Sequence, residues 1–108
     1  MPYISEDERP GLDRSVDAMI DAILFDVKPE EKWELPKLLG RINYCFSRVA
    51  AHLTLTEDGV SYRNVAMITG VLENIKQEFY RRVASPYEDK KIRENGDIFE
   101  YKLIDRST

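Results

Sequence analysis

The fold is decided by one segment, SYRNVAMITGVLENIKQEFYRRVASP, which covers residues 61–86. Its apolar side chains recur at alternating intervals of three and four residues; they are Val65, Ile68, Leu72, Ile75 and Phe79. This spacing is typical of an amphipathic α-helix, because it places these side chains on one face. Ser61 is a favourable N-cap, whereas Pro86 lacks the amide hydrogen that a helix interior needs. The segment therefore predicts a helix over residues 62–84 that ends before Pro86.

Two further apolar stripes precede this segment and predict two more helices. The first helix is expected over residues 13–27, with Asp13 as its N-cap. The second is expected over residues 36–53, with Pro36 at its first position. Small residues on the second and third helices favour a tight antiparallel hairpin between them. A second face of the third helix would suit a helix from another subunit, so we expect a homo-oligomer.

After Pro86 the chain carries two competing signals. Asn95-Gly96 is typical of a two-residue hairpin turn, with arms at residues 90–94 and 97–104. The alternative is a short helix over residues 87–94 that Gly96 closes. We therefore predict a single, mainly α domain over residues 1–108: a three-helix bundle with a short C-terminal β-hairpin or extended arm over residues 86–108.

Composition limits the classes of function. The chain has 108 residues and a net charge of -4, which argues against general nucleic-acid binding, because that needs a broad basic surface. No apolar run approaches the length of a membrane span, so we expect no membrane association. Cys45 is the single cysteine. It allows no internal disulfide and fits a reducing compartment, so we expect a cytoplasmic protein.

Catalytic signals are weak in this sequence. His52 is the single histidine, and Cys45 lies two helical turns away from it, so the two side chains cannot touch on one helix. Residues 30–34, EEKWE, are similar to the metal-binding EExxE element of all-helical nucleotide pyrophosphohydrolases, but no second carboxylate pair follows at the required spacing. We therefore expect no catalytic residue, no metal and no cofactor, and we predict that the protein is not an enzyme.

A group of polar and aromatic residues is the best candidate for a ligand site. Arg81 and Arg82 end the third helix just ahead of Tyr87. Arginine holds phosphate or carboxylate groups with a planar fork, and tyrosine offers a stacking surface. The candidate ligand-binding residues are Asn43, Tyr44, Glu73, Tyr80, Arg81, Arg82, Tyr87 and Lys90. The alternative is that these charges form ion pairs with neighbouring acids on a solvated surface.

Three motifs carry a resemblance to a known family. They are GxxNY at residues 40–44, GVLExxKxEFYRR at residues 70–82 and PYEDKKxxENGD at residues 86–97. With these motifs the chain resembles an uncharacterised family of small proteins from bacteriophages and prokaryotes, a domain of unknown function. The resemblance implies a phage or mobile-element setting and a protein of the host cytoplasm. The chain departs from the family pattern at Arg41, where the resemblance leads us to expect an acid.

We hypothesise that the protein binds an anionic, nucleotide-like small molecule without turning it over, as a sponge against host defence. Arginine would hold the phosphate and tyrosine would stack the base. The second hypothesis is a protein-interaction module that acts on a host or phage protein through the basic bend and the C-terminal arm. The third is a degenerate all-helical nucleotide pyrophosphohydrolase, which the missing carboxylates disfavour.

Overall fold

The mainly helical fold is confirmed by a computed structural model, which describes residues 4–28, 30–55 and 60–107. The described residues contain more α-helices than the three expected. They also fall into two compact units, residues 1–59 and 60–108, which are described one at a time below. The predicted hairpin of the second and third helices would join these two units, and it stays a prediction, as does the single domain.

The first unit is built from two α-helices. Its elements are η1 (Glu6–Glu8), α1 (Arg9–Leu24), η2 (Lys32–Glu34) and α2 (Leu35–Thr54). The predicted bounds of α2 agree with the structure to within one residue at each end. The predicted start of α1 at Asp13 is wrong, because Pro10 lies in the first turn, where its missing amide costs no hydrogen bond. Asp13 lies inside the helix instead.

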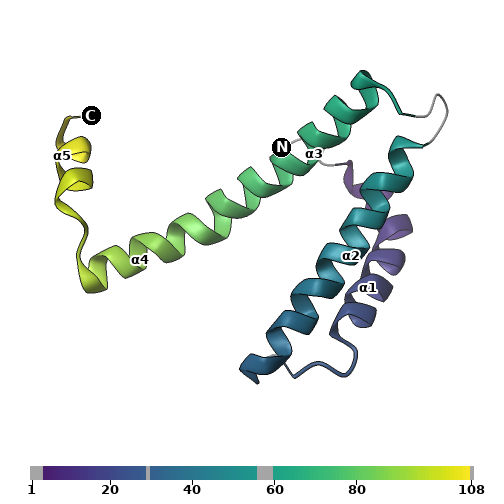
Figure 1. The fold of residues 1–108 in the computed structure, drawn as a ribbon, viewed down its shortest axis with the longest axis horizontal. Helices are drawn as coiled ribbons and strands as arrows, with labels where there is room; N and C mark the ends of the chain where they lie inside the picture. Colours follow the sequence, from purple (N-terminus) through teal and green to yellow (C-terminus); the bar gives the residue numbers. More distant parts are fainter. Residues whose placement is uncertain (1–3, 29, 56–59, 108) are drawn as a thin grey trace. The chain divides into compact units, whose positions relative to one another are not determined.

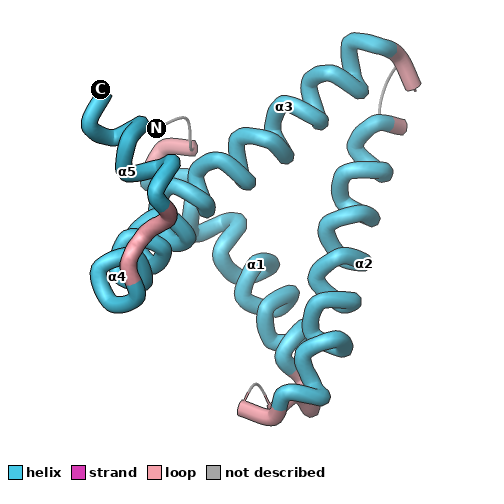
Figure 2. Tube along the Cα trace, turned by 60° about the vertical axis from the view of Figure 1, so that its left-hand side comes forward, coloured by secondary structure: helices cyan, strands magenta, loops and turns pink. Residues whose placement is uncertain are grey.

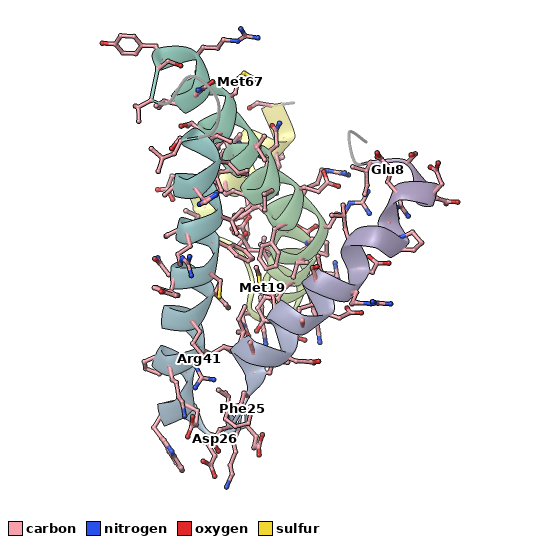
Figure 3. The ribbon with its side chains drawn as sticks, turned by 90° about the vertical axis from the view of Figure 1, so that its right-hand side faces the viewer. Glu8, Met19, Phe25, Asp26, Arg41 and Met67 are labelled. Carbon is pink, nitrogen blue, oxygen red and sulfur yellow. The ribbon has the colours of Figure 1, made fainter. Side chains whose placement is uncertain are left out.

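The predicted end of α1 at Val27 is also wrong, because α1 ends at Leu24. Asp26 adopts a left-handed backbone with φ 55°, which stops helical propagation. The freed carbonyls receive donors from α2, as Figure 3 shows for Arg41. Its guanidinium Nη1 lies 3.0 Å from the carbonyl oxygen of Ile23 and 2.5 Å from that of Phe25. The end of α1 is thus capped by a side chain of the neighbouring helix α2.

Ile23 is the core of this first unit. It is 8% exposed and is the one buried residue in the parts of the chain that the structure describes. It lies one residue before the end of α1, beside the Arg41 cap. The α1–α2 hairpin is therefore closed most firmly at the end where its two helices connect (Figure 3).

The second unit is dominated by one long helix, which we define as residues 62–95. It consists of α3 (Tyr62–Phe79), a π-helical segment η3 (Tyr80–Ala84) and α4 (Ser85–Asn95), and these run on without a break in Figure 1. The predicted cap is confirmed, since the Asn64 amide donates to the Ser61 hydroxyl at 3.1 Å. No helix in the described residues is long and apolar enough to cross a membrane.

The prediction that Pro86 ends the helix is wrong, and the π segment explains why. In a regular α-helix the ring of Pro86 would clash with the carbonyl of Arg82, and the proline would donate no hydrogen bond to it. A π turn closes from residue i to i+5 and so contains one extra residue per turn. The Ser85 amide accordingly donates to the carbonyl of Tyr80. The backbone is displaced just ahead of the proline, and the helix continues through it.

The predicted C-terminal β-hairpin and extended arm are also wrong. Figure 2 shows helices joined by loops and no strand in the described residues, and the last described element is α5 (Phe99–Ser107). A tight hairpin turn of the Asn-Gly type needs a positive φ at both central residues. Here Gly96 has φ 85°, while Asn95 remains the last residue of α4. The dipeptide therefore closes a helix, as the alternative prediction held.

Candidate functional site

The paired arginines lie on the π segment and share one carboxylate. Arg81 Nη2 donates to Glu78 Oε1 at 2.9 Å, and Arg82 Nε donates to the same oxygen. The hydrogen bond from Arg82, with that from Arg81 and the two positive charges, lowers the pKa of Glu78 below its ordinary value. The side chains of both arginines remain more than half exposed. Two cations therefore share one anion, and the three side chains together keep a net positive charge.

Tyr80 is held on another side of the same segment. Its hydroxyl donates to Glu88 Oε2 at 2.8 Å, and this bond joins η3 to α4. The bond to Glu88 raises the pKa of the Tyr80 phenol, because ionisation would remove the donated proton and place a second anion beside the carboxylate. The Tyr80 hydroxyl therefore links η3 to α4 and already has a hydrogen-bond partner.

The other predicted residues of this unit also have neighbours on their own helix. The ammonium of Lys91 lies 5.5 Å from the centre of the Tyr87 ring. Glu73 pairs with Lys76 at 3.5 Å and accepts a hydrogen bond from Gln77 at 3.1 Å. Lys90 is exposed on α4. Because these side chains lie along one helix and pair with near neighbours, the second unit by itself does not bring them together in a concave site.

Asn43 and Tyr44 lie on α2, in the first unit. The Ser47 hydroxyl donates to Asn43 Oδ1 at 3.2 Å, and the Arg48 guanidinium lies 6.0 Å from the centre of the Tyr44 ring. Both residues are exposed. Their predicted convergence with Glu73 and Tyr80 would join the two units, and it stays a prediction.

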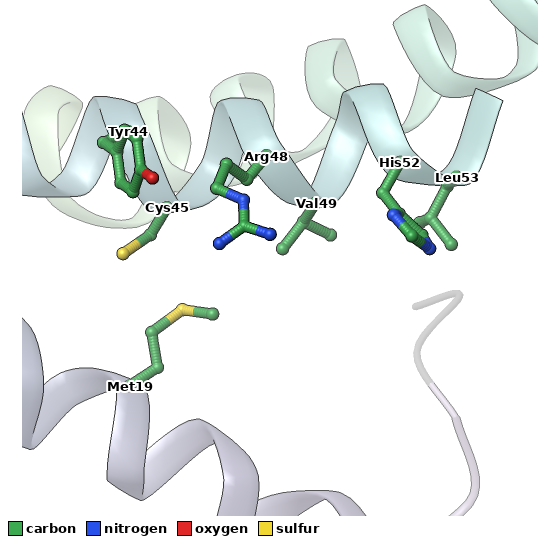
Figure 4. Close-up of a pocket in the computed structure, with 7 residues that line it drawn as sticks. All are labelled: Met19, Tyr44, Cys45, Arg48, Val49, His52 and Leu53. Carbon is green, nitrogen blue, oxygen red and sulfur yellow. The ribbon is translucent and has the colours of Figure 1, made fainter. Parts of the chain in front are cut away.

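Sequence reasoning missed a pocket between α1 and α2 in the first unit (Figure 4). It has a volume of about 370 Å³, and it is lined by Met19, Tyr44, Cys45, Arg48, Val49, His52 and Leu53. In the close-up Met19 extends from α1 toward the α2 side chains. The spacing of four residues from Tyr44 to Arg48 and again to His52 could have indicated this line on one face of α2. The walls are mostly apolar, with a basic edge.

No group of three or more histidine, cysteine, aspartate or glutamate side chains that could hold a metal occurs in the described parts of the chain. Cys45 is half-buried in the pocket, on the apolar line of α2. Arg41, at the position where an acid was expected, caps α1 and has a structural role.

The long helix of the second unit carries an exposed row of apolar side chains. We define the apolar stripe as Val65, Ile68, Leu72, Ile75, Phe79, Val83 and Tyr87 along the long helix. No residue described in this unit is buried, and the Phe79 side chain is 63% exposed. Scattered exposed apolar residues are ordinary, but a contiguous row along a whole helix marks an interaction surface.

Comparison with known proteins places the chain in a family without giving it an activity. No curated protein and no solved structure matches the chain. A family model described as Domain of unknown function (DUF6899) matches residues 1–98. That match ends at residue 98, directly before α5 begins at Phe99. The chain therefore belongs to the family described as Domain of unknown function (DUF6899).

Proposed function

We propose that this protein is a non-enzymatic interaction module, and that the apolar stripe of its long helix is the surface that binds. The observation that carries the proposal is the contrast between the polar and apolar groups of the second unit. Arg81, Arg82 and Tyr80 have partners within their own helix, whereas the stripe is covered by nothing in that unit. Burial of apolar surface is the dominant driving force for most protein association. A partner that covered the apolar stripe would therefore gain binding free energy from it.

The stripe defines the kind of partner. A narrow row of side chains at alternating three- and four-residue spacing fits another helix or a groove between helices. The resemblance to bacteriophage proteins suggests a cytoplasmic setting in which that partner is a host or phage protein. Side chains such as Leu72 and Ile75 would be its anchors, since each is about half exposed and near the middle of the row.

The test substitutes one stripe residue and one matched residue off the stripe in the full-length chain. Ile75→Asn places an amide in the middle of the row, and Met67→Asn makes the same chemical change at an exposed position of α3 outside it. Both variants are immobilised beside the unaltered chain, and bound protein is measured with lysate and with purified chain. We expect Ile75→Asn to lose at least tenfold in binding and Met67→Asn to lose less than twofold. Equal losses in the two variants would refute the proposal.

The anionic-ligand hypothesis is a second candidate, and the shared carboxylate of Glu78 favours it. Arg81 and Arg82 now share a single oxygen of the Glu78 carboxylate. A phosphate bound there would offer the two guanidinium groups several acceptor oxygens instead. We infer a weak nucleotide site at the π segment, in keeping with the sponge hypothesis. Glu78→Gln should then strengthen nucleotide binding, because it removes the competing charge, and Arg82→Ala should weaken it. A nucleotide panel that gives no thermal shift with either variant would eliminate this candidate.

A further inference from the structure

We propose that the occupant of the apolar stripe is the same stripe on further copies of this chain, arranged in parallel and in register, with their π segments at one level. This inference rests on the proposed function, because it names the partner of the surface assigned there. Three observations carry it: the change of register at the π segment, the composition of the stripe, and the pairing of the charges beside it.

The π segment keeps the stripe on one face of the helix. Beyond Phe79, the alternating spacing of a regular helix would next bring Arg82 and Pro86 to the face. The π turn contains one extra residue, so each later position moves on by one. Val83 and Tyr87 then follow Phe79. The π segment thus extends the apolar stripe by one further turn and moves Arg82 off it.

Identical copies match this geometry best. In heptad terms Val65, Leu72, Phe79 and Tyr87 occupy a positions, and Ile68, Ile75 and Val83 occupy d positions. A partner of regular α-helix would lose register where the long helix contains its extra residue. A parallel copy has its own extra residue at the same level, so both faces shift together.

The ends of the stripe favour the parallel arrangement over the antiparallel one. In parallel helices each a position faces an a position and each d position a d position. In antiparallel helices a faces d. Because the stripe begins at Val65 and ends at Tyr87, both a positions, antiparallel pairing leaves one of these two ends without a partner.

The charges that flank the stripe permit close contact between copies. Glu78 is paired with Arg82, and Glu73 with Lys76, within each chain. These two acids therefore do not have to enter the contact as unneutralised charges. The core residues also indicate the number of copies, because Leu72 at an a position with Ile68 and Ile75 at d positions favours three or four strands over two.

Single-cysteine crosslinking of the full-length chain tests the arrangement. In a Cys45→Ala background, Val83→Cys puts thiols of parallel, in-register copies face to face, so we expect a disulfide-linked dimer under mild oxidation. Gln77→Cys, on the opposite face of the helix, is the matched control and should crosslink at least tenfold more slowly. A mixture of Val65→Cys and Val83→Cys chains should give no mixed disulfide above the Gln77→Cys level. Rapid mixed crosslinking, or crosslinking of Val83→Cys no faster than the control, would overturn the proposal.

Pro86→Ala tests the role of the π segment. With the proline removed, a regular α-helix is allowed, and Arg82 returns to the face in place of Val83. We expect sedimentation equilibrium to show association at least tenfold weaker than in the unaltered chain. At low concentration the variant should no longer reach the mass of three or four chains. Association of unchanged strength would overturn the register argument. An unaltered chain that stays monomeric but binds another protein through Ile75 would overturn this inference and leave the proposed function standing.

Discussion

Arg41 is expected to be the residue on which the first unit depends most. The perturbation we suggest is Arg41→Met, which keeps the length of the apolar stem and removes the donors. Arg41 Nη1 donates to the carbonyls of Ile23 and Phe25, so the substitution leaves both oxygens without that partner at the end of α1. It also removes a cation from the negative end of the helix dipole.

The magnitude follows from the burial of the two hydrogen bonds. A hydrogen bond to a charged group contributes about 1.5–3 kcal/mol. Only the bond to Ile23 is partly buried, and the bond to Phe25 is exposed and shares the same nitrogen. We therefore count one bond in full and expect the free energy of unfolding to fall by about 2 kcal/mol. Arg41→Lys should recover part of this loss, because an ammonium keeps the charge but lacks the planar fork.

The assay uses the single tryptophan of the chain as a local probe. Trp33 lies in η2, directly before α2, so its fluorescence reports on the first unit. A loss of about 2 kcal/mol corresponds to a fall of about 0.7–2 M in the urea midpoint at the slopes usual for small proteins. Arg48→Met is the control, since Arg48 is an exposed cation on the same helix. An Arg41→Met midpoint within error of the Arg48→Met midpoint would refute the reasoning.

Three further outcomes are expected. Gly96→Ala should lower stability by about 1–3 kcal/mol in thermal unfolding, because its φ of 85° with ψ of 167° is a region that only glycine adopts readily. Gly70→Ala should raise helix stability by about 1 kcal/mol if the second face of α3 stays open, since an added Cβ meets nothing within 4 Å; a lower melting temperature would show that another backbone docks there. The pKa of Tyr80 should lie above that of an ordinary tyrosine in an absorbance titration, and Glu88→Gln should lower it, because Glu88 is the main cause of the shift. Because the bond needs the neutral phenol, its contribution should be complete below pH of about 10 and disappear as the pH rises through the pKa of Tyr80.

The helices were predictable where the apolar spacing was regular and the cap was local. The apolar spacing over residues 36–53 and Pro36 predicted α2, and Ser61 predicted the start of α3. These signals act between residues a few positions apart, so they do not depend on how the rest of the chain folds. The end of α1 was not predictable in this way, because it depends on Arg41 from another helix and on the left-handed backbone of Asp26.

The region around Pro86 shows why residue preferences were insufficient there. Proline and Asn-Gly both interrupt regular secondary structure in isolation. Pro86 therefore predicted the end of a helix, and Asn95-Gly96 predicted the centre of a hairpin. The helix instead absorbs the proline with one π turn, at the cost of irregular hydrogen bonding over residues 80–84. Such a turn has no sequence signature of its own. The useful signal was the row itself, since Val83 and Tyr87 continue it only if one residue is inserted.

The candidate ligand residues illustrate a different limit. Sequence reasoning placed Tyr80, Arg81 and Arg82 close together and was right about their proximity along the chain. It left open whether they face a ligand or their own neighbouring acids, and in the second unit they face Glu78 and Glu88. A site on one helix cannot be concave, because successive side chains point about 100° apart. A second surface has to complete it.

That requirement links the two proposals for this protein. A parallel assembly through the apolar stripe would bring several copies of Arg81 and Arg82 to one level, while each copy contributes a single Glu78 carboxylate to them. The excess of positive charge would then grow with the number of chains, and with it the attraction for an anion. Nucleotide binding should therefore depend on association. If Ile75→Asn abolished association and left nucleotide affinity unchanged in a fluorescence titration, the two properties would be independent and this link would be wrong.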